Sequence, residues 1–231
     1  MAGPTRWEVF RLKNWMLFSN MIANAVGVAV VIFLTGHTGL VSAFPEAYAV
    51  IHVVSMIFLP LSFMVPVLLV IGYEWPIRSY LNQEQRGDEI PQERLIEARR
   101  RLLNEPFVLI SVDFGIWLVS GIVYPAVLWL WGAPREILGQ PFFMSLFTGL
   151  ITTAFAFFVL EHVLQRRLVP HFFPQGGLYT TPGTLRIRIG TRIAALVFAA
   201  NLVPFFAILN MAGGTFSPAG DAAQVLHELR T

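Results

Sequence analysis

The chain contains no cysteine, and charged residues make up only 13% of its 231 residues. The missing thiols exclude disulfide bonds, thiolate metal sites and a cysteine nucleophile. Soluble domains carry about 25% charged residues, so roughly half of the usual polar coat is missing. Hydrophobic residues reach 55%, and a surface this apolar is solvated by a lipid bilayer rather than by water. The net charge of +2 is too small to indicate a nucleic-acid partner.

Motifs for catalysis and cofactor binding are also missing. The sequence has no G-x-x-x-x-G-K-[ST] phosphate loop, no H-E-x-x-H zinc motif and no defensible Ser–His–Asp or paired-carboxylate set. A transmembrane haem would need two histidines at similar depth, but His52 and His162 fall near opposite faces of the predicted membrane domain. The sequence therefore predicts no catalytic centre in this chain, no metal site and no cofactor.

Five long apolar runs dominate the chain instead. About 20 apolar residues in a helix cross a 30 Å hydrocarbon layer, and a backbone in lipid must pair its own polar groups. Each run is therefore predicted to be a transmembrane helix, with its prolines causing kinks rather than ends. The runs cover residues 15–35, 49–72, 107–131, 142–160 and 193–211. The predicted fold class is all-α, a polytopic transmembrane bundle over residues 1–211 with about five spans arranged as helical hairpins.

Basic residues are divided unequally between the two sides of this predicted bundle. Fourteen of the sixteen fall in the N-terminal arm and in the loops over residues 74–106 and 161–192, against Arg135 and Arg230 on the other side. Cytoplasmic loops are enriched in Lys and Arg, so we expect a multi-pass protein of the cell's inner membrane. Its N-terminus would be cytoplasmic and its tail over residues 212–231 extracytoplasmic.

One cytoplasmic segment, residues 91–103, has the pattern of an amphipathic helix. Its acids come early and its arginines late, which suits the helix dipole. Leu95, Ala98 and Leu102 share one face, and Glu97 is placed to pair with Arg101. Two interpretations are open: a helix lying on the inner leaflet, or a surface that docks a partner. The arginines expected to contact anionic headgroups are Arg99, Arg100, Arg101, Arg166 and Arg167.

Asp113 is the only charged residue inside a predicted span, about two turns beyond its inner end. Inserting a carboxylate in the bilayer costs about 2.5–3.5 kcal/mol, so such a residue marks either function or a buried partner. Asp113 is accordingly interpreted either as part of a switch or as a group hydrogen-bonded to Ser, Thr or Asn of a neighbouring helix. Asn20, Asn24 and Asn201 are the other intramembrane polar residues singled out, with Asn24 and Asn201 as the site candidates. Asparagine commonly links helices in membranes.

Small residues spaced four apart predict places where two helices approach closely. Ala23 with Gly27, and Ser145 with Gly149, have this spacing. Such pairs allow backbones to come together because no large side chain stands between them.

The most distinctive stretch joins the fourth run to the fifth. It reads EHVLQRRLVPHFFPQGGL over residues 161–178 and LRIRIGTR over residues 185–192. This stretch resembles the N-terminal six-span membrane domain that precedes HAMP linkers in bacterial class III adenylate/guanylate cyclases and related sensor kinases. Those domains carry an arginine–proline turn, an FPxGxL motif and a basic lead-in to their fifth span. Residues 98–106, ARRRLLNEP, also resemble the lead-in to their third span.

This resemblance covers most of residues 10–211 and carries over no catalytic residue. It implies a dimeric sensory or regulatory input module, coupled to a cytoplasmic cyclase or histidine kinase and responding to a lipophilic ligand or to the bilayer. The odd span count leads us to expect that a sixth span and an effector domain follow. The alternatives are a small subunit of a membrane complex or a permease. A permease needs inverted repeats, whereas the first two predicted hairpins share one orientation.

Overall fold

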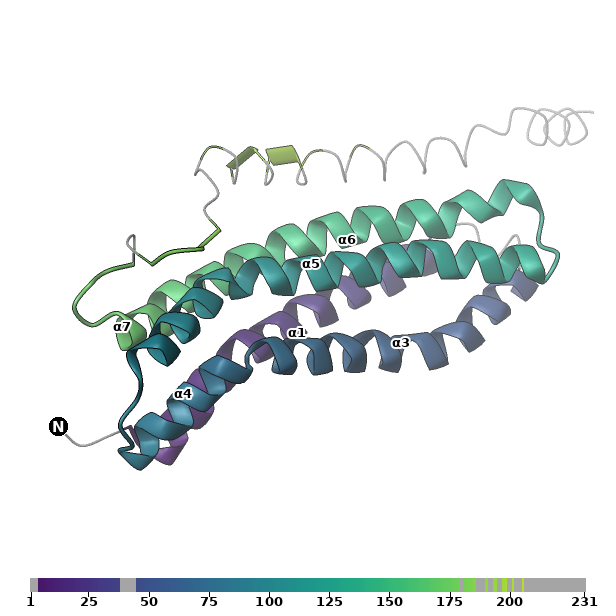
Figure 1. Ribbon diagram of the computed structural model, residues 1–231. Coiled ribbons are helices and arrows are strands. Elements are labelled where there is room, and N and C mark those ends of the chain that lie inside the picture. The colour runs from purple at the N-terminus through teal and green to yellow at the C-terminus, as the bar shows by residue number, and fades with distance from the viewer. Residues whose placement is uncertain are drawn as a thin grey trace, which may run out of the picture.

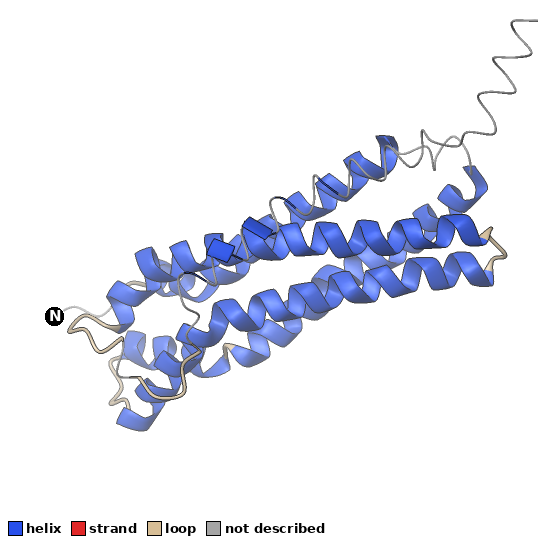
Figure 2. Cartoon of the chain, turned by 90° about the horizontal axis from the view of Figure 1, so that it is seen from above, coloured by secondary structure: helices blue, strands red, loops and turns tan. Residues whose placement is uncertain are grey.

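The computed structural model describes residues 4–37, 45–178 and 181–185, and seven single positions between residues 190 and 205. This part of the chain is helical, without a strand (Figures 1 and 2). The helices are α1 (Arg6–His37), α3 (Pro45–Tyr73), α4 (Trp75–Arg86), α5 (Gln92–Leu130), α6 (Arg135–Val163), the π-helical turn η1 (Leu164–Leu168) and α7 (Val169–Phe172).

Four of these helices are long and apolar enough to cross a membrane: α1, α3, α5 and α6. They contain the predicted spans over residues 15–35, 49–72, 107–131 and 142–160, so the all-α transmembrane fold class is confirmed. Pro60, Pro66 and Pro125 lie inside their helices and do not end them. The fifth predicted span falls on residues of which only single positions are described, and the tail over residues 212–231 lies outside the described residues.

The four long helices run side by side as two layers (Figures 1 and 2). The α5 and α6 helices pack along most of their length, α1 packs on α6 and α3 packs on α5. The α1 and α3 helices contact each other little. Three of the four interfaces between neighbouring long helices are therefore well packed, and the α1–α3 interface is loose.

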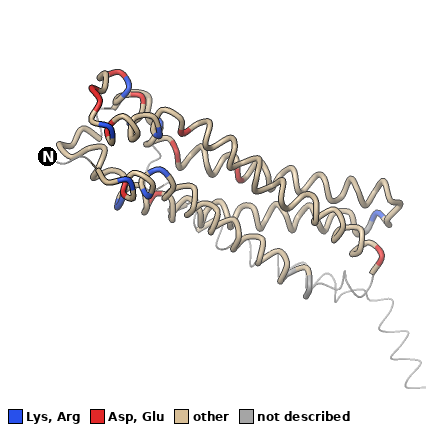
Figure 3. The backbone as a smooth tube through the Cα atoms, turned by 90° about the horizontal axis from the view of Figure 1, so that it is seen from below, with Lys and Arg blue, Asp and Glu red and all other residues tan. Residues whose placement is uncertain are grey.

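The main hydrophobic core lies at one end of the bundle. Charged side chains gather at the same end. Figure 3 shows Lys, Arg, Asp and Glu gathered at this end, which we call the basic end. Side chains from seven segments are buried there, among them Met16, Leu81, Leu102, Leu160 and Phe172. The basic end is therefore the firmly packed part of the described structure.

Close helix approach occurs at two of the small residues picked out in the sequence. A Cβ atom on Gly27 would lie 2.2 Å from Thr152 Oγ1 of α6, and one on Gly149 would lie 2.6 Å from Trp117 Cβ of α5. Real Cβ atoms do not approach so closely, so glycine is required at both positions to keep these helices in contact.

The segment over residues 91–103 differs from the expected separate surface helix. It forms the first turns of α5, and the helix continues through Pro106 into the apolar span. Glu105 and Pro106 are both buried, so tertiary packing overrides the tendency of a proline to end a helix. The predicted apolar face is present, because Ala98 and Leu102 are fully buried; α4 packs against this helix.

Candidate functional site

A polar triad links α1 to α5 within the apolar part of the bundle. The Asp113 carboxyl accepts a hydrogen bond from Asn20 Nδ2 at 3.1 Å and another from Asn24 Nδ2 at 2.8 Å. Asn24 Nδ2 also donates to the Asn20 backbone carbonyl at 3.1 Å. Asp113 and Asn20 are only 3% and 4% exposed. The structure thus brings Asp113 together with Asn20 and Asn24, two of the asparagines predicted to link helices.

The triad lies on the wall of a cavity of about 460 Å³ between α1, α3, α5 and α6. Its lining on α1 runs from Leu17 to Thr35, which corresponds to about 27 Å along the helix axis. Most lining side chains are apolar, and none of the described lining residues is Lys or Arg. Ligand pockets of about 300–1,000 Å³ with apolar walls and a few placed polar groups are typical of small-molecule sites.

Two further hydrogen bonds border the cavity beyond the triad. The Ser55 hydroxyl of α3 and the Tyr124 hydroxyl of α5 lie 2.9 Å apart, and those of Ser120 and Ser145 join α5 to α6 at 3.0 Å. All four residues line the cavity. Polar contacts at successive depths therefore hold α3, α5 and α6 around the space, while α1 contributes the asparagines.

A second buried polar cluster, which the sequence reasoning missed, lies at the basic end. Glu74, the single residue between α3 and α4, and Glu105 of α5 are each 2% exposed. Arg78 donates through Nε to Glu74 Oε2 at 2.7 Å and also contacts the Lys13 carbonyl at 3.0 Å and Asn14 Oδ1 at 3.2 Å. This cluster ties α4 to α1.

Burial beside the Glu74 carboxyl raises the pKa of the Glu105 carboxyl well above its usual range. Glu74 Oε1 is buried without a hydrogen-bond partner. The raised pKa favours a neutral Glu105 next to the ion pair between Glu74 and the Arg78 guanidinium. The sequence carried a signal for this carboxyl pair, because Glu74 follows one predicted span and Glu105 precedes the next on the same side.

The arginines expected at the inner leaflet have different environments. Arg99 donates to the Phe172 carbonyl at 2.8 Å and lies over the Phe173 ring, while Arg101 pairs with Glu97 at 2.7 Å as predicted and lies over Tyr73. Arg100 also pairs with Glu97, at 2.6 Å. Arg166 and Arg167 are exposed on η1. Arg99, Arg100 and Arg101 are thus engaged by groups of the protein itself.

Arg167 of η1 and Arg11 of α1 both contact the ring of Trp15 on α1. The Arg167 guanidinium lies 5.3 Å from the Trp15 ring centroid, and that of Arg11 lies 5.5 Å from the same centroid.

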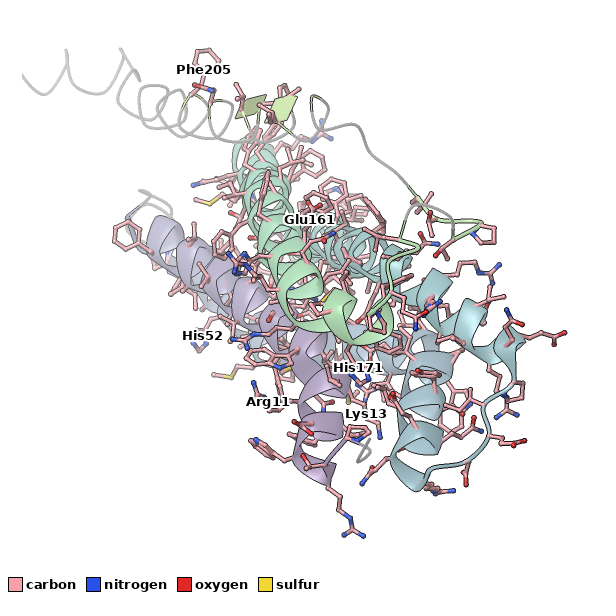
Figure 4. The ribbon with its side chains drawn as sticks, turned by 90° about the vertical axis from the view of Figure 1, so that its left-hand side faces the viewer. Arg11, Lys13, His52, Glu161, His171 and Phe205 are labelled. Atoms are coloured by element: carbon pink, nitrogen blue, oxygen red, sulfur yellow. The ribbon has the colours of Figure 1, made fainter. Side chains whose placement is uncertain are left out.

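Figure 4 views the basic end and shows Arg11 and Lys13 on α1, with His171 on α7 nearby. His171 Nε2 lies 2.8 Å from Glu84 Oε2, so this histidine has a structural partner on α4.

The remaining sequence candidates lie apart from the triad. Asn201 donates to the Val197 carbonyl at 2.7 Å, a bond within its own segment. His52 lines the cavity, whereas His162 is exposed at the end of α6. Within the described residues no group of three His, Cys, Asp or Glu side chains is placed to hold a metal ion.

Comparison with known proteins adds no relative. The chain matches no protein-family model, no curated protein and no solved structure.

Proposed function

We propose that this chain is a membrane-embedded sensory or regulatory input module whose input site is the cavity between α1, α3, α5 and α6. The observation that supports the proposal is the combination of a space of about 460 Å³ with the buried Asp113 triad on its wall. A lipophilic ligand reaches such a site from the bilayer. Its polar group would find hydrogen-bonding partners there and its apolar part a matching wall.

Transmission would begin with a change in how α1 and α3 pack. These two helices contact each other little, whereas α5 and α6 are tightly packed. A ligand between them shifts the equilibrium between packings only if it binds one packing better than the other. The α3 helix is joined to α4 through Glu74 alone, so a displacement of α3 reaches the basic end.

We further propose that the chain acts as a dimer in the cell's inner membrane, with its basic end cytoplasmic and contacting anionic lipid headgroups. The output would be an adenylate or guanylate cyclase or a histidine kinase. This part rests on the charge asymmetry and on the resemblance of residues 98–106 and 161–192 to the membrane domains of such proteins. The codons after Thr231, or the adjacent genes, should then encode one of these effectors. A transport ATPase or respiratory-complex subunit encoded there would instead favour the permease or structural-subunit alternatives.

The coupling between cavity and basic end can be tested by filling the cavity. Ser62 lines it, and the Ser62 hydroxyl is bonded only to the Leu59 carbonyl of its own helix, at 2.7 Å. Ser62→Phe adds a ring in the cavity, while Leu61→Phe, at a neighbouring exposed position outside the lining, is the matched control. Because the chain has no cysteine, spin labels can be attached at Arg86→Cys on α4 and Gln165→Cys on η1 without background.

We expect Ser62→Phe to shift the distance distribution between the two labels by several ångströms in nanodiscs, and Leu61→Phe to leave it unchanged. Identical distributions for Ser62→Phe and the unsubstituted background would show that cavity occupancy does not reach the basic end, and would refute the input-module proposal.

A further inference from the structure

The hydrogen-bond inventory of the Asp113 triad is one-sided. Both Asp113 oxygens accept bonds, and the Nδ2 groups of Asn20 and Asn24 are directed to Asp113. Asn24 also uses its second amide hydrogen, on the Asn20 carbonyl. In contrast, Asn20 Oδ1 is buried without a partner, and no described residue donates to Asn24 Oδ1. The triad therefore has two amide oxygens that can accept a hydrogen bond from a ligand, and few N–H groups left to donate one.

The charge around the triad is also one-sided. Asp113 is the only acidic residue among the described cavity-lining residues, and no Lys or Arg among them faces it. An opposite charge brought into such a low-dielectric site interacts far more strongly than it would in water. The two amide donors already satisfy the carboxylate, which lowers the cost of keeping it buried beside a cation.

We infer that the cavity binds a lipophilic amine, with its ammonium group among Asp113 and the Asn20 and Asn24 side chains and its hydrocarbon part along the apolar wall. An ammonium group has three donors and no acceptor, which matches the unfilled acceptors of the triad. The hydrocarbon part would extend toward Val28, Val31 and Ile32 of α1, which line the cavity beyond Asn24. This inference rests on the proposed function, since it takes the cavity to be a ligand site, and it names the ligand's chemical class.

Other lipophilic classes fit the same space less well. A fatty acid would place a second carboxylate beside Asp113 with no cation between them, which is electrostatically unfavourable. A fatty alcohol offers a single donor and no charge. The alcohol can donate a hydrogen bond but cannot form an ion pair with Asp113, so we expect the amine to bind about tenfold more tightly than the alcohol.

The test is a matched series of ligands that differ only in the polar group: dodecylamine, dodecanol and dodecanoate. Binding to the full chain is measured by isothermal titration calorimetry in nanodiscs of zwitterionic phosphatidylcholine, with empty nanodiscs to subtract partitioning into lipid. We expect saturable binding of dodecylamine, about tenfold weaker binding of dodecanol, and no dodecanoate binding above the empty-disc signal. Equal affinities, a preference for dodecanoate, or no binding above empty discs would overturn the inference.

Asp113→Asn tests the source of the preference. It removes the charge while keeping the shape, so dodecylamine should then bind no more tightly than dodecanol. Glu93→Gln is the matched control, because it removes a carboxylate from an exposed position on the same helix. If Asp113→Asn keeps the amine preference, the inference is wrong. Should that variant fail to fold, the order of the three ligands on the unsubstituted protein still decides.

These outcomes can be separated from those of the spin-label experiment. Binding of dodecylamine that depends on Asp113, without any coupling between the cavity and the labels on α4 and η1, would keep this inference and refute the sensory proposal. A shift caused by Ser62→Phe without amine binding would do the reverse.

Discussion

The carboxyl pair at the basic end allows a prediction that distinguishes its two members. In Glu105→Gln, a neutral amide replaces a carboxyl whose neutral form is already favoured by its burial beside Glu74, and the ion pair between Glu74 and Arg78 remains. Exchanging one neutral polar group for another of similar size should cost at most about 1 kcal/mol of unfolding free energy.

Glu74→Gln should be far more damaging. It leaves the Arg78 guanidinium, whose side chain is 18% exposed, without its carboxylate. Removing one partner of a buried ion pair costs about 3–5 kcal/mol. The Lys13 carbonyl and Asn14 Oδ1 still accept from Arg78, so we expect a loss near the lower end of that range. The difference between the two variants should be about 2 kcal/mol or more in favour of Glu105→Gln.

The measurement is unfolding of each variant in mixed detergent micelles, followed by loss of helical circular dichroism as denaturing detergent is added. Glu84→Gln serves as a control, since Glu84 lies on α4 but is only half-buried and pairs with His171. If Glu105→Gln destabilises the protein as much as Glu74→Gln does, Glu105 is not neutral in the folded protein and our account of this cluster is wrong.

Two more predictions concern packing and surface charge. Gly149→Ala should destabilise the protein by about 1–3 kcal/mol, because the new Cβ would meet Trp117 at 2.6 Å. Gly115→Ala on α5, where a Cβ meets nothing within 4 Å, should be neutral or slightly stabilising; equal losses in the same unfolding assay would contradict the close-contact argument. Glu97→Gln should change stability by less than about 1 kcal/mol, since its partners Arg100 and Arg101 are substantially exposed; a larger loss would show that the pairs act as a network.

Properties that depend on short stretches of sequence were predicted well. Span positions follow from run length and from the need to pair the backbone in lipid, and these give α1, α3, α5 and α6 their places. Pairing of Glu97 with Arg101 follows from helical spacing alone. The close approaches at Gly27 and Gly149 were also indicated by spacing, although the sequence did not identify Thr152 and Trp117 as the neighbours.

Properties that depend on the rotation and depth of two helices were predicted less well. The possibility that Asp113 bonds to an asparagine of another helix agrees with the structure. Nothing in the sequence fixed α1 as that helix, because its rotation depends on packing against α6. Glu105 was overlooked because a glutamate beside a basic segment resembles an ordinary surface residue. Its burial depends on where α4 lies, and the continuity of α5 through Pro106 was hidden for the same reason.

The lengths of α3, α4 and α5 have a mechanical consequence. Backbone hydrogen bonds continue across the bend at Glu74: the Glu74 N–H donates to the Val70 carbonyl, and the Arg78 N–H donates to the Glu74 carbonyl. The two helices are therefore directly coupled through this residue. The α5 helix has 39 residues, about 58 Å, or almost twice the thickness of the hydrocarbon layer. Gln92 begins about 32 Å before Asp113 along that helix. A small tilt pivoting near Asp113 would therefore be magnified at the tip of the α4–α5 hairpin, as at the end of a long lever.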